Sequence, residues 1–241
     1  MSETQAAEIT SRLKHLQLAR GQFLIREGQV CCMKKQAAIS LLVFTALLVF
    51  TMVLHPAGGS VEHLIHISNT IIATHSIALL SLPFGWVGCL GFSRMLGTER
   101  FEVLLAFAMI SLALLAVMIA AATNGLILPI FLQPYKEAGP ETIASIKPIL
   151  RYGFAINHAF DYIYTFAFSL AILCWSIAIL KTKKFSAWLG WSGLILAAGA
   201  IIIFLSGISV NDLTGLRIFI TGIVIWIVLA GWQMLRNSPQ N

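Results

Sequence analysis

Six long apolar stretches limit most strongly what this chain can fold into. They cover Gln36–Leu54, Thr70–Phe92, Val103–Leu128, Tyr152–Leu180, Trp188–Ile208 and Ile218–Leu235. A helix needs about 20 mainly apolar residues to cross a hydrocarbon core of about 30 Å. Helices also satisfy their own backbone hydrogen bonds, which a lipid-embedded segment requires. The sequence therefore predicts an all-α integral membrane protein, a bundle of six transmembrane helices.

The overall composition agrees with a membrane protein. Only 11% of the residues are charged and 58% are hydrophobic, whereas soluble domains carry roughly 25% charged residues. The net charge of +6 would suit nucleic acid, but the chain lacks a basic stripe with interleaved aromatic residues. We therefore expect the lipid bilayer as a partner and no nucleic acid.

The Lys and Arg residues between the apolar stretches predict the orientation. Cytoplasmic connections carry most of the Lys and Arg of inner-membrane proteins. With the N-terminus inside, the cytoplasmic side holds Arg12, Lys14, Arg20, Arg26, Lys34, Lys35, Arg94, Arg100, Lys181, Lys183, Lys184 and Arg236. The outer side then holds only Lys136, Lys147, Arg151 and Arg217. This distribution predicts a protein of a bacterial inner membrane with both termini in the cytoplasm.

Residues 1–32 differ from the rest of the chain because they are polar and only weakly amphipathic. The MKK that begins at Met33 reads like an ordinary start of a bacterial membrane protein. We interpret residues 1–32 as a cytoplasmic tail, or as a segment preceding a true start near Met33. Residues 33–241 form the predicted transmembrane domain.

Polar residues within the apolar stretches are candidates for function, because burying them in lipid is costly. In the predicted topology they lie toward the outer ends of the spans. The candidate ligand or proton pocket consists of His75, Asn124, Asn157, His158, Asp161 and Tyr162. Asp161 is the only carboxylate well inside an apolar stretch, and His158 precedes it by one helical turn. This pair has two interpretations, a functional proton-sharing pair or a polar clamp that joins helices.

Histidines also raise the question of a bound metal or haem. His63 and His66 are one turn apart and could together ligate a divalent metal, although histidines at a membrane surface are common. A haem b needs two axial imidazoles at similar depth on different helices, and His75 with His158 is the pair that meets this requirement. Either cofactor thus remains an alternative.

The glycines Gly85, Gly88 and Gly91 recur every three residues in the second stretch and predict close helix packing. Pro140 predicts the start of a short outer helix in the loop before the fourth stretch.

The segments MVLHPAGGSVEHLIH, AATNGLILPIF and NHAFDYIY, followed by a KTKK turn, give the chain a resemblance to a class of small uncharacterised bacterial six-span membrane proteins. The resemblance covers most of the chain from Met33 onward, and it implies a fold and a shared outer polar site but no activity.

No nucleotide-binding, hydrolase or metalloprotease motif is present in the sequence. Three functional hypotheses follow. The first is a non-enzymatic protein that binds or transports a small ligand or a proton. The second is an electron-transfer protein that binds haem b through His75 and His158. The third is a metal-dependent membrane enzyme that uses His63, His66, His158 and Asp161.

Overall fold

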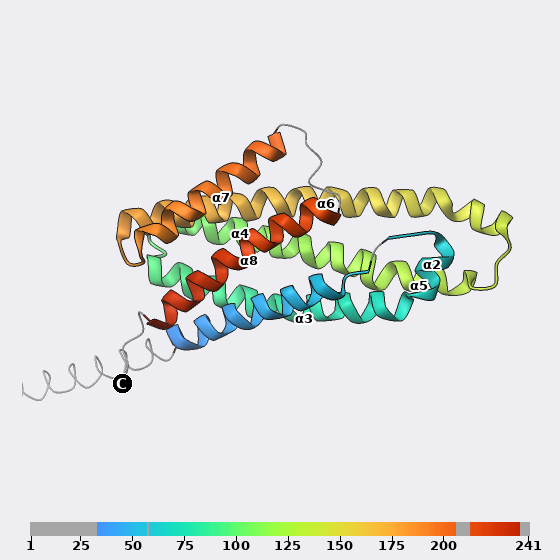
Figure 1. The fold of residues 1–241 in the computed structure, drawn as a ribbon, viewed down its shortest axis with the longest axis horizontal. Helices are drawn as coiled ribbons and strands as arrows, with labels where there is room; N and C mark the ends of the chain where they lie inside the picture. Colours follow the sequence, from blue (N-terminus) through green and yellow to red (C-terminus); the bar gives the residue numbers. More distant parts are fainter. Residues whose placement is uncertain (1–32, 57, 206–212, 237–241) are drawn as a thin grey trace, which may run out of the picture.

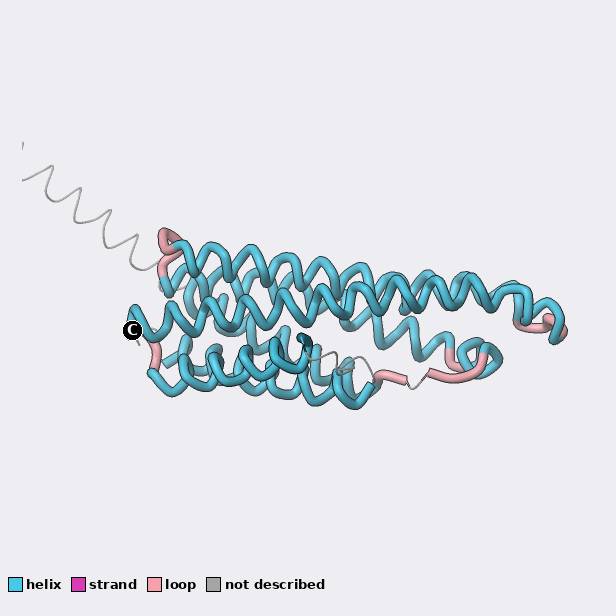
Figure 2. The backbone as a smooth tube through the Cα atoms, turned by 90° about the horizontal axis from the view of Figure 1, so that it is seen from above, coloured by secondary structure: helices cyan, strands magenta, loops and turns pink. Residues whose placement is uncertain are grey.

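The computed structural model describes residues 33–56, 58–205 and 213–236, and these residues form helices with no strand among them (Figures 1 and 2). The first helix, Met33–Leu54, is called helix 1. It is followed by α2 (Val61–His66), α3 (Ser68–Leu96), α4 (Phe101–Ala122), the π-helical turn η1 (Thr123–Ile127), α5 (Leu128–Leu132), the 3-10 turn η2 (Gln133–Tyr135), α6 (Pro140–Thr182), α7 (Ala187–Leu205) and α8 (Leu213–Arg236). The predicted tail 1–32 lies outside the described residues.

Among the described residues, five helical segments are long and apolar enough to cross a membrane: Met33–Leu54, Ser68–Leu96, Phe101–Tyr135, Pro140–Thr182 and Ile218–Arg236. The prediction of an all-helical, multi-pass architecture is therefore confirmed. The helix Ala187–Ile203 is apolar but shorter than these five. The sixth span and the orientation of the termini stay predictions.

The long helices run side by side along one axis, so the bundle has two distinct ends (Figure 1). At one end lie the start of helix 1, the α3–α4 and α6–α7 connections, and the end of α8; we call this the basic end. At the other end lie α2, α5 and the start of α6, and we call this the cap end.

Helix 1 packs against α3 along the glycine stripe that the sequence predicts. A Cβ added at Gly88 would lie 2.8 Å from the backbone of Leu41, and one at Gly85 would lie 3.0 Å from the ring of Phe44. At Gly91 an added Cβ would overlap Ala37. Only glycine lets the two backbones approach this closely, so the predicted role of the stripe is confirmed.

An aromatic cluster fills the core toward the basic end. The indole rings of Trp175 and Trp226 stack with their centroids 6.4 Å apart, and Phe92 meets both rings edge-on. The buried indole N–H of Trp175 donates to the Ser93 hydroxyl over 3.0 Å. This hydrogen bond satisfies a polar group that would otherwise be costly to bury.

The helix α6 is the longest of the described elements and projects beyond the others at the cap end (Figure 2). Its 43 residues correspond to about 64 Å at 1.5 Å per residue, roughly twice the hydrocarbon thickness. It begins at Pro140, as predicted, but the short outer helix expected there is not separate, because α6 continues without interruption into the expected span from Tyr152. Its first turns pack on α2, the start of α3 and α5 in a separate apolar cluster of Leu64, Ile71, Leu132, Ile143, Ile146 and Leu150.

Candidate functional site

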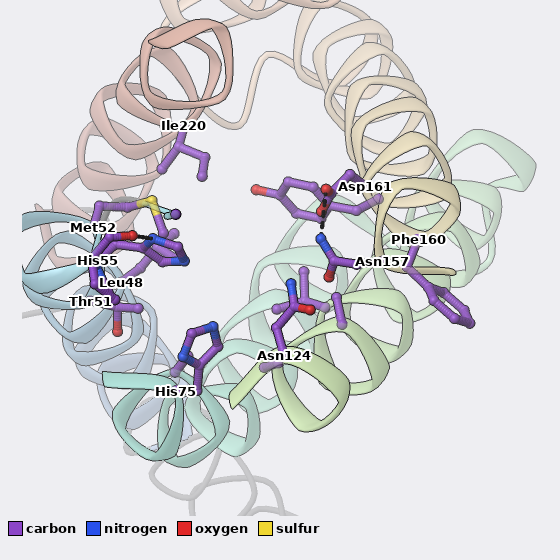
Figure 3. Close-up of a pocket in the computed structure, with 17 residues that line it drawn as sticks. Leu48, Thr51, Met52, His55, His75, Asn124, Asn157, Phe160, Asp161 and Ile220 are labelled. Atoms are coloured by element: carbon purple, nitrogen blue, oxygen red, sulfur yellow. Dashed lines mark hydrogen bonds between the residues drawn. The ribbon is translucent and has the colours of Figure 1, made fainter. Parts of the chain in front are cut away.

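A cavity of about 400 Å³ lies between helix 1, α3, α4 with its π-helical turn, α6 and α8 (Figure 3). Its walls are largely apolar, with residues such as Leu48, Ala78 and Val117. Polar side chains are contributed by four of these elements: Thr51, His55, His75, Asn124, Asn157, Asp161 and Tyr164. The site therefore combines an apolar wall with a few converging polar groups, as small-molecule sites in proteins commonly do.

His75 lies on α3, and its side chain is buried, with 8% exposed. Its Nδ1 is 2.8 Å from the carbonyl oxygen of Ile71, one turn earlier. A carbonyl only accepts, so Nδ1 carries the proton and donates. In the neutral ring Nε2 is then a hydrogen-bond acceptor. Figure 3 shows the imidazole pointing into the cavity.

Asn124 reaches the cavity from the π-helical turn η1. In this turn the N–H of Leu128 bonds the carbonyl of Thr123, five residues back. Pro129 follows directly and has no N–H to continue the α-helical pattern. Gly125 permits the wide turn to touch α3, because a Cβ added there would overlap the side chain of His75. Glycine and proline thus position the amide of Asn124 beside the imidazole.

Asn157 and Asp161 come from α6, one turn apart on its inner face. The Asn157 Nδ2 donates to the Asp161 Oδ2 over 3.1 Å (Figure 3). This contact holds one carboxylate oxygen and leaves the Asn157 carbonyl as an acceptor. Tyr164, one turn further along α6, is buried with 7% exposed and lines the same cavity.

His55 is a cavity residue that the sequence analysis did not select. Its ring centroid is 5.2 Å from that of His75, with the planes inclined by 60°. Its Nδ1 is 3.1 Å from the carbonyl of Pro56, so Nε2 of the neutral ring is again an acceptor. The sequence did contain a signal for His55. Helix 1 and α3 are successive long helices that run antiparallel, so His55, just after the end of helix 1, is expected at the same depth as His75 in the early turns of α3.

The other predicted residues lie elsewhere. His158 and Tyr162 are exposed on α6, with their rings 5.3 Å apart in an edge-to-face contact, and neither lines the cavity. His63 and His66 are exposed on α2. The described residues contain no group of three or more His, Cys, Asp or Glu placed to hold a metal ion. The structure therefore brings together His75, Asn124, Asn157 and Asp161, but places the other four outside this group.

The charge of the cavity wall is limited. Its ionisable side chains are the imidazoles of His55 and His75, the carboxyl of Asp161 and the phenol of Tyr164, and no Lys or Arg is among the described lining residues. The Nδ1 of His75 is bonded to a carbonyl and Asn157 donates to Asp161, while the amides of Asn124 and Asn157 and the hydroxyl of Tyr164 can donate further hydrogen bonds. The wall thus offers both donors and acceptors to a guest.

No protein-family model, curated protein or solved structure matches this chain.

Proposed function

We propose that this protein is a six-span protein of a bacterial inner membrane, with both termini in the cytoplasm. Its function is to bind, and to pass across or within the membrane, a small hydrogen-bonding ligand or a proton. The binding site is the cavity between helix 1, α3, α4, α6 and α8, and binding involves no covalent chemistry on the ligand.

The observation that carries the proposal is the convergence of His75, Asn124, Asn157 and Asp161 on one cavity. Several hydroxyl groups elsewhere in the bundle donate within their own helix; Thr45, for example, donates to the Leu41 carbonyl over 2.7 Å. The cavity residues instead expose hydrogen-bonding atoms to a shared space. Polar groups inside a membrane bundle cost free energy unless they have partners, so their convergence is evidence for a guest.

The charge distribution along the bundle supports the orientation. The end of α3, the start of α4, the α6–α7 turn and the end of α8 all lie at the basic end (Figure 1). The described basic residues there are Lys34, Lys35, Arg94, Arg100, Lys181, Lys183, Lys184 and Arg236, against Lys136, Lys147 and Arg151 at the cap end. The positive-inside rule then assigns the basic end to the cytoplasm. The cavity accordingly opens in the outer half of the membrane.

The chemistry available in the cavity is proton exchange and hydrogen bonding. The Nε2 of a neutral His75 can take up a proton, and the side chain of Asp161 on the facing helix can release one when its carboxyl group is protonated. The amide groups of Asn124 and Asn157 line the same cavity as His75 and Asp161. They can orient a water molecule or a hydroxyl group of a ligand. This set can bind and relay, but it contains no activated nucleophile of the Ser–His or Cys–His type.

The proposal is tested with the full-length protein in liposomes. Proton entry under a K⁺ diffusion potential is followed with an internal pH dye, and small molecules that copurify in nanodiscs are identified by mass spectrometry. We expect a proton flux above that of empty liposomes or a stoichiometric polar molecule, lost in Asp161→Asn and His75→Leu and retained in His158→Ala. If neither signal appears with folded protein, or if both persist in Asp161→Asn and His75→Leu, the proposal is refuted and the polar residues are a structural clamp.

A further inference from the structure

Asp161 places a carboxyl group in a cavity whose described wall contains no Lys or Arg. Within the cavity the neutral amide of Asn157 donates to its Oδ2 over 3.1 Å. His158 interacts electrostatically with Asp161 from the same helix, but its side chain is exposed and does not line the cavity. A carboxyl group inside a membrane bundle needs either a proton or a nearby positive charge. From the cavity side, that role falls to a proton or to a cation that enters the cavity.

Two asparagine side chains provide oxygen atoms near this carboxyl group. Figure 3 shows the amide of Asn157 between Asp161 and Asn124. Carboxylate and amide oxygens are the ligands that hard cations prefer in proteins. The Asn157 nitrogen donates to Asp161, and a half-turn about the terminal torsion of Asn157 exchanges its nitrogen and oxygen. Asn157 can therefore hydrogen-bond the carboxylate or join it as an oxygen ligand.

The π-helical turn η1 releases a further oxygen at Asn124. The N–H of Leu128 bonds the carbonyl of Thr123 in this turn, so the same pattern would assign the N–H of residue 129 to the carbonyl of Asn124. Residue 129 is a proline, which has no N–H. Backbone carbonyls that lose their helical donor recur as Na⁺ ligands in membrane transporters. Asn124 thus combines a side-chain oxygen in the cavity wall with a main-chain carbonyl that lacks its helical donor.

The charge of the cavity selects the class of cation. The single carboxylate of Asp161 balances one positive charge, whereas a divalent ion would keep an uncompensated charge in a largely apolar space, which is costly. The described residues contain no group of three or more His, Cys, Asp or Glu placed to hold a metal ion, and transition metals prefer such nitrogen and sulfur ligands. A monovalent cation that accepts neutral oxygen ligands satisfies both limits.

The cavity extends to the cap end of the bundle. Pro56 and Gly58, in the connection between helix 1 and α2, belong to its wall, and Gly58 is exposed. In the proposed topology this connection lies at the outer surface of the membrane. An ion dissolved in the outer water therefore reaches the cavity without crossing lipid.

We propose that this cavity binds an alkali-metal cation at the carboxylate of Asp161, with oxygens of Asn124 and Asn157 as further ligands. The cation and a proton compete for the same carboxylate, so the cavity holds one or the other. The inference rests on the proposed function, in which Asp161 exchanges a proton, and extends it by naming the ion that takes the place of the proton.

Other ionisable groups near the cavity must be separated from Asp161 in any pH dependence. His55 after helix 1, His75 on α3 and Tyr164 on α6 line the cavity, and His158 lies outside it. A protonated imidazole would also repel a cation. Competition that belongs to Asp161 must therefore persist in His55→Leu, His75→Leu and His158→Ala.

The test measures saturable binding of radioactive Na⁺ to the full-length protein in nanodiscs by scintillation proximity. Binding is measured over a series of pH values and against unlabelled choline chloride and MgCl₂. Asp161→Asn removes the charged ligand, and Asn124→Leu removes a neutral one. Asn69→Leu makes the same change on α3 at an exposed residue that does not line the cavity, so it is the matched control. Folding of each variant is checked by tryptophan fluorescence.

We expect binding to be lost in Asp161→Asn, to need at least tenfold more Na⁺ in Asn124→Leu and to be unchanged in Asn69→Leu. In the wild type and in each histidine variant, the Na⁺ concentration at half-saturation is expected to rise as the pH falls, because protons occupy the same carboxylate. This pH series needs only the wild type, so it decides even if Asp161→Asn or Asn124→Leu does not fold.

Four outcomes overturn the inference: no saturable Na⁺ binding, binding retained in folded Asp161→Asn, binding that does not weaken as the pH falls, or competition by choline or Mg²⁺ as strong as that by unlabelled Na⁺. If Na⁺ does not bind while proton flux or a copurifying ligand still depends on Asp161, only this inference falls. If flux and ligand are absent as well, the proposed function falls with it.

Discussion

Replacing Gly125 by alanine tests whether the π-helical turn is packed on His75. A Cβ at this position overlaps the Cβ and Cγ of His75 and lies 2.9 Å from its Cδ2. The imidazole tip can rotate away, but Cβ moves only with the backbone of α3. Overpacking typically costs about 1–3 kcal/mol. Because the His75 Cβ cannot move without the backbone, we expect the cost of this overlap to be about 3 kcal/mol. Alanine gains about 1 kcal/mol over glycine in a helix, so we expect Gly125→Ala to lower the free energy of unfolding by about 2 kcal/mol.

The matched control is Gly153→Ala on α6. A Cβ added at Gly153 meets nothing within 4 Å, so this variant keeps the helix-propensity gain and is expected to be about 0.5–1 kcal/mol more stable than the wild type. Both variants are measured by equilibrium unfolding in mixed micelles, followed by tryptophan fluorescence. If Gly125→Ala is as stable as Gly153→Ala, the close contact between Gly125 and His75 does not exist in the folded protein. Gly125→Ala is further expected to weaken any binding that depends on His75.

Three further predictions concern other parts of the bundle. Ser93→Ala leaves the buried Trp175 N–H without its acceptor, so we expect about 1–3 kcal/mol lower stability and a change in tryptophan emission; an unchanged spectrum would contradict this. A green fluorescent protein fused to the C-terminus is expected to fluoresce and an alkaline phosphatase inserted between η2 and α6 to be active; the reverse pattern would refute the N-in, C-in topology. The Ser60 hydroxyl, which caps α2, lowers the pKa of Glu62, so a carboxyl titration followed by NMR should show that pKa below its ordinary value and rising in Ser60→Ala. Because the folded-state pKa is depressed, the contribution of Glu62 to stability is present above its unfolded pKa and is lost as the pH falls through the folded value.

The sequence was sufficient to predict the long helices, because each depends on a local property of the chain. Length and apolarity define the spans, Pro140 marks a helix start, and the glycine spacing on α3 predicts a close contact without naming its partner. The partner, helix 1, becomes visible only when the chain is folded. The predicted fourth span also began at Tyr152, twelve residues late for the helix, because polar residues such as Lys147 end an apolar stretch without ending a helix.

The candidate site was predictable only in part, because the sequence does not show which side of each helix faces the cavity. Asn157, His158 and Asp161 share one segment of sequence, but which edge of α6 faces the cavity depends on its neighbours. The structure turns Asn157 and Asp161 inward and leaves His158 exposed. The contribution of His55 depends on how helix 1 pairs with α3. The π-helical turn arises from a combination of Gly125, Pro129 and tertiary contact, which helical periodicity does not reveal.

The π-helical turn has a consequence for the length of the chain. A π turn holds one residue more than an α turn, so α4 through α5 contains one residue beyond what a continuous α-helix of the same rise requires. Deleting Leu126 would therefore allow the turn to close as a continuous α-helix, with the residues on either side kept in nearly the same orientation. Leu132, which is 1% exposed in the apolar cluster at the cap end, would keep its contacts, whereas deleting one residue more would rotate it by about 100° around the axis. The extra residue thus affects the turn that carries Asn124 and Gly125 rather than the helices on either side, and homologous sequences aligned without a gap here are expected to share the turn.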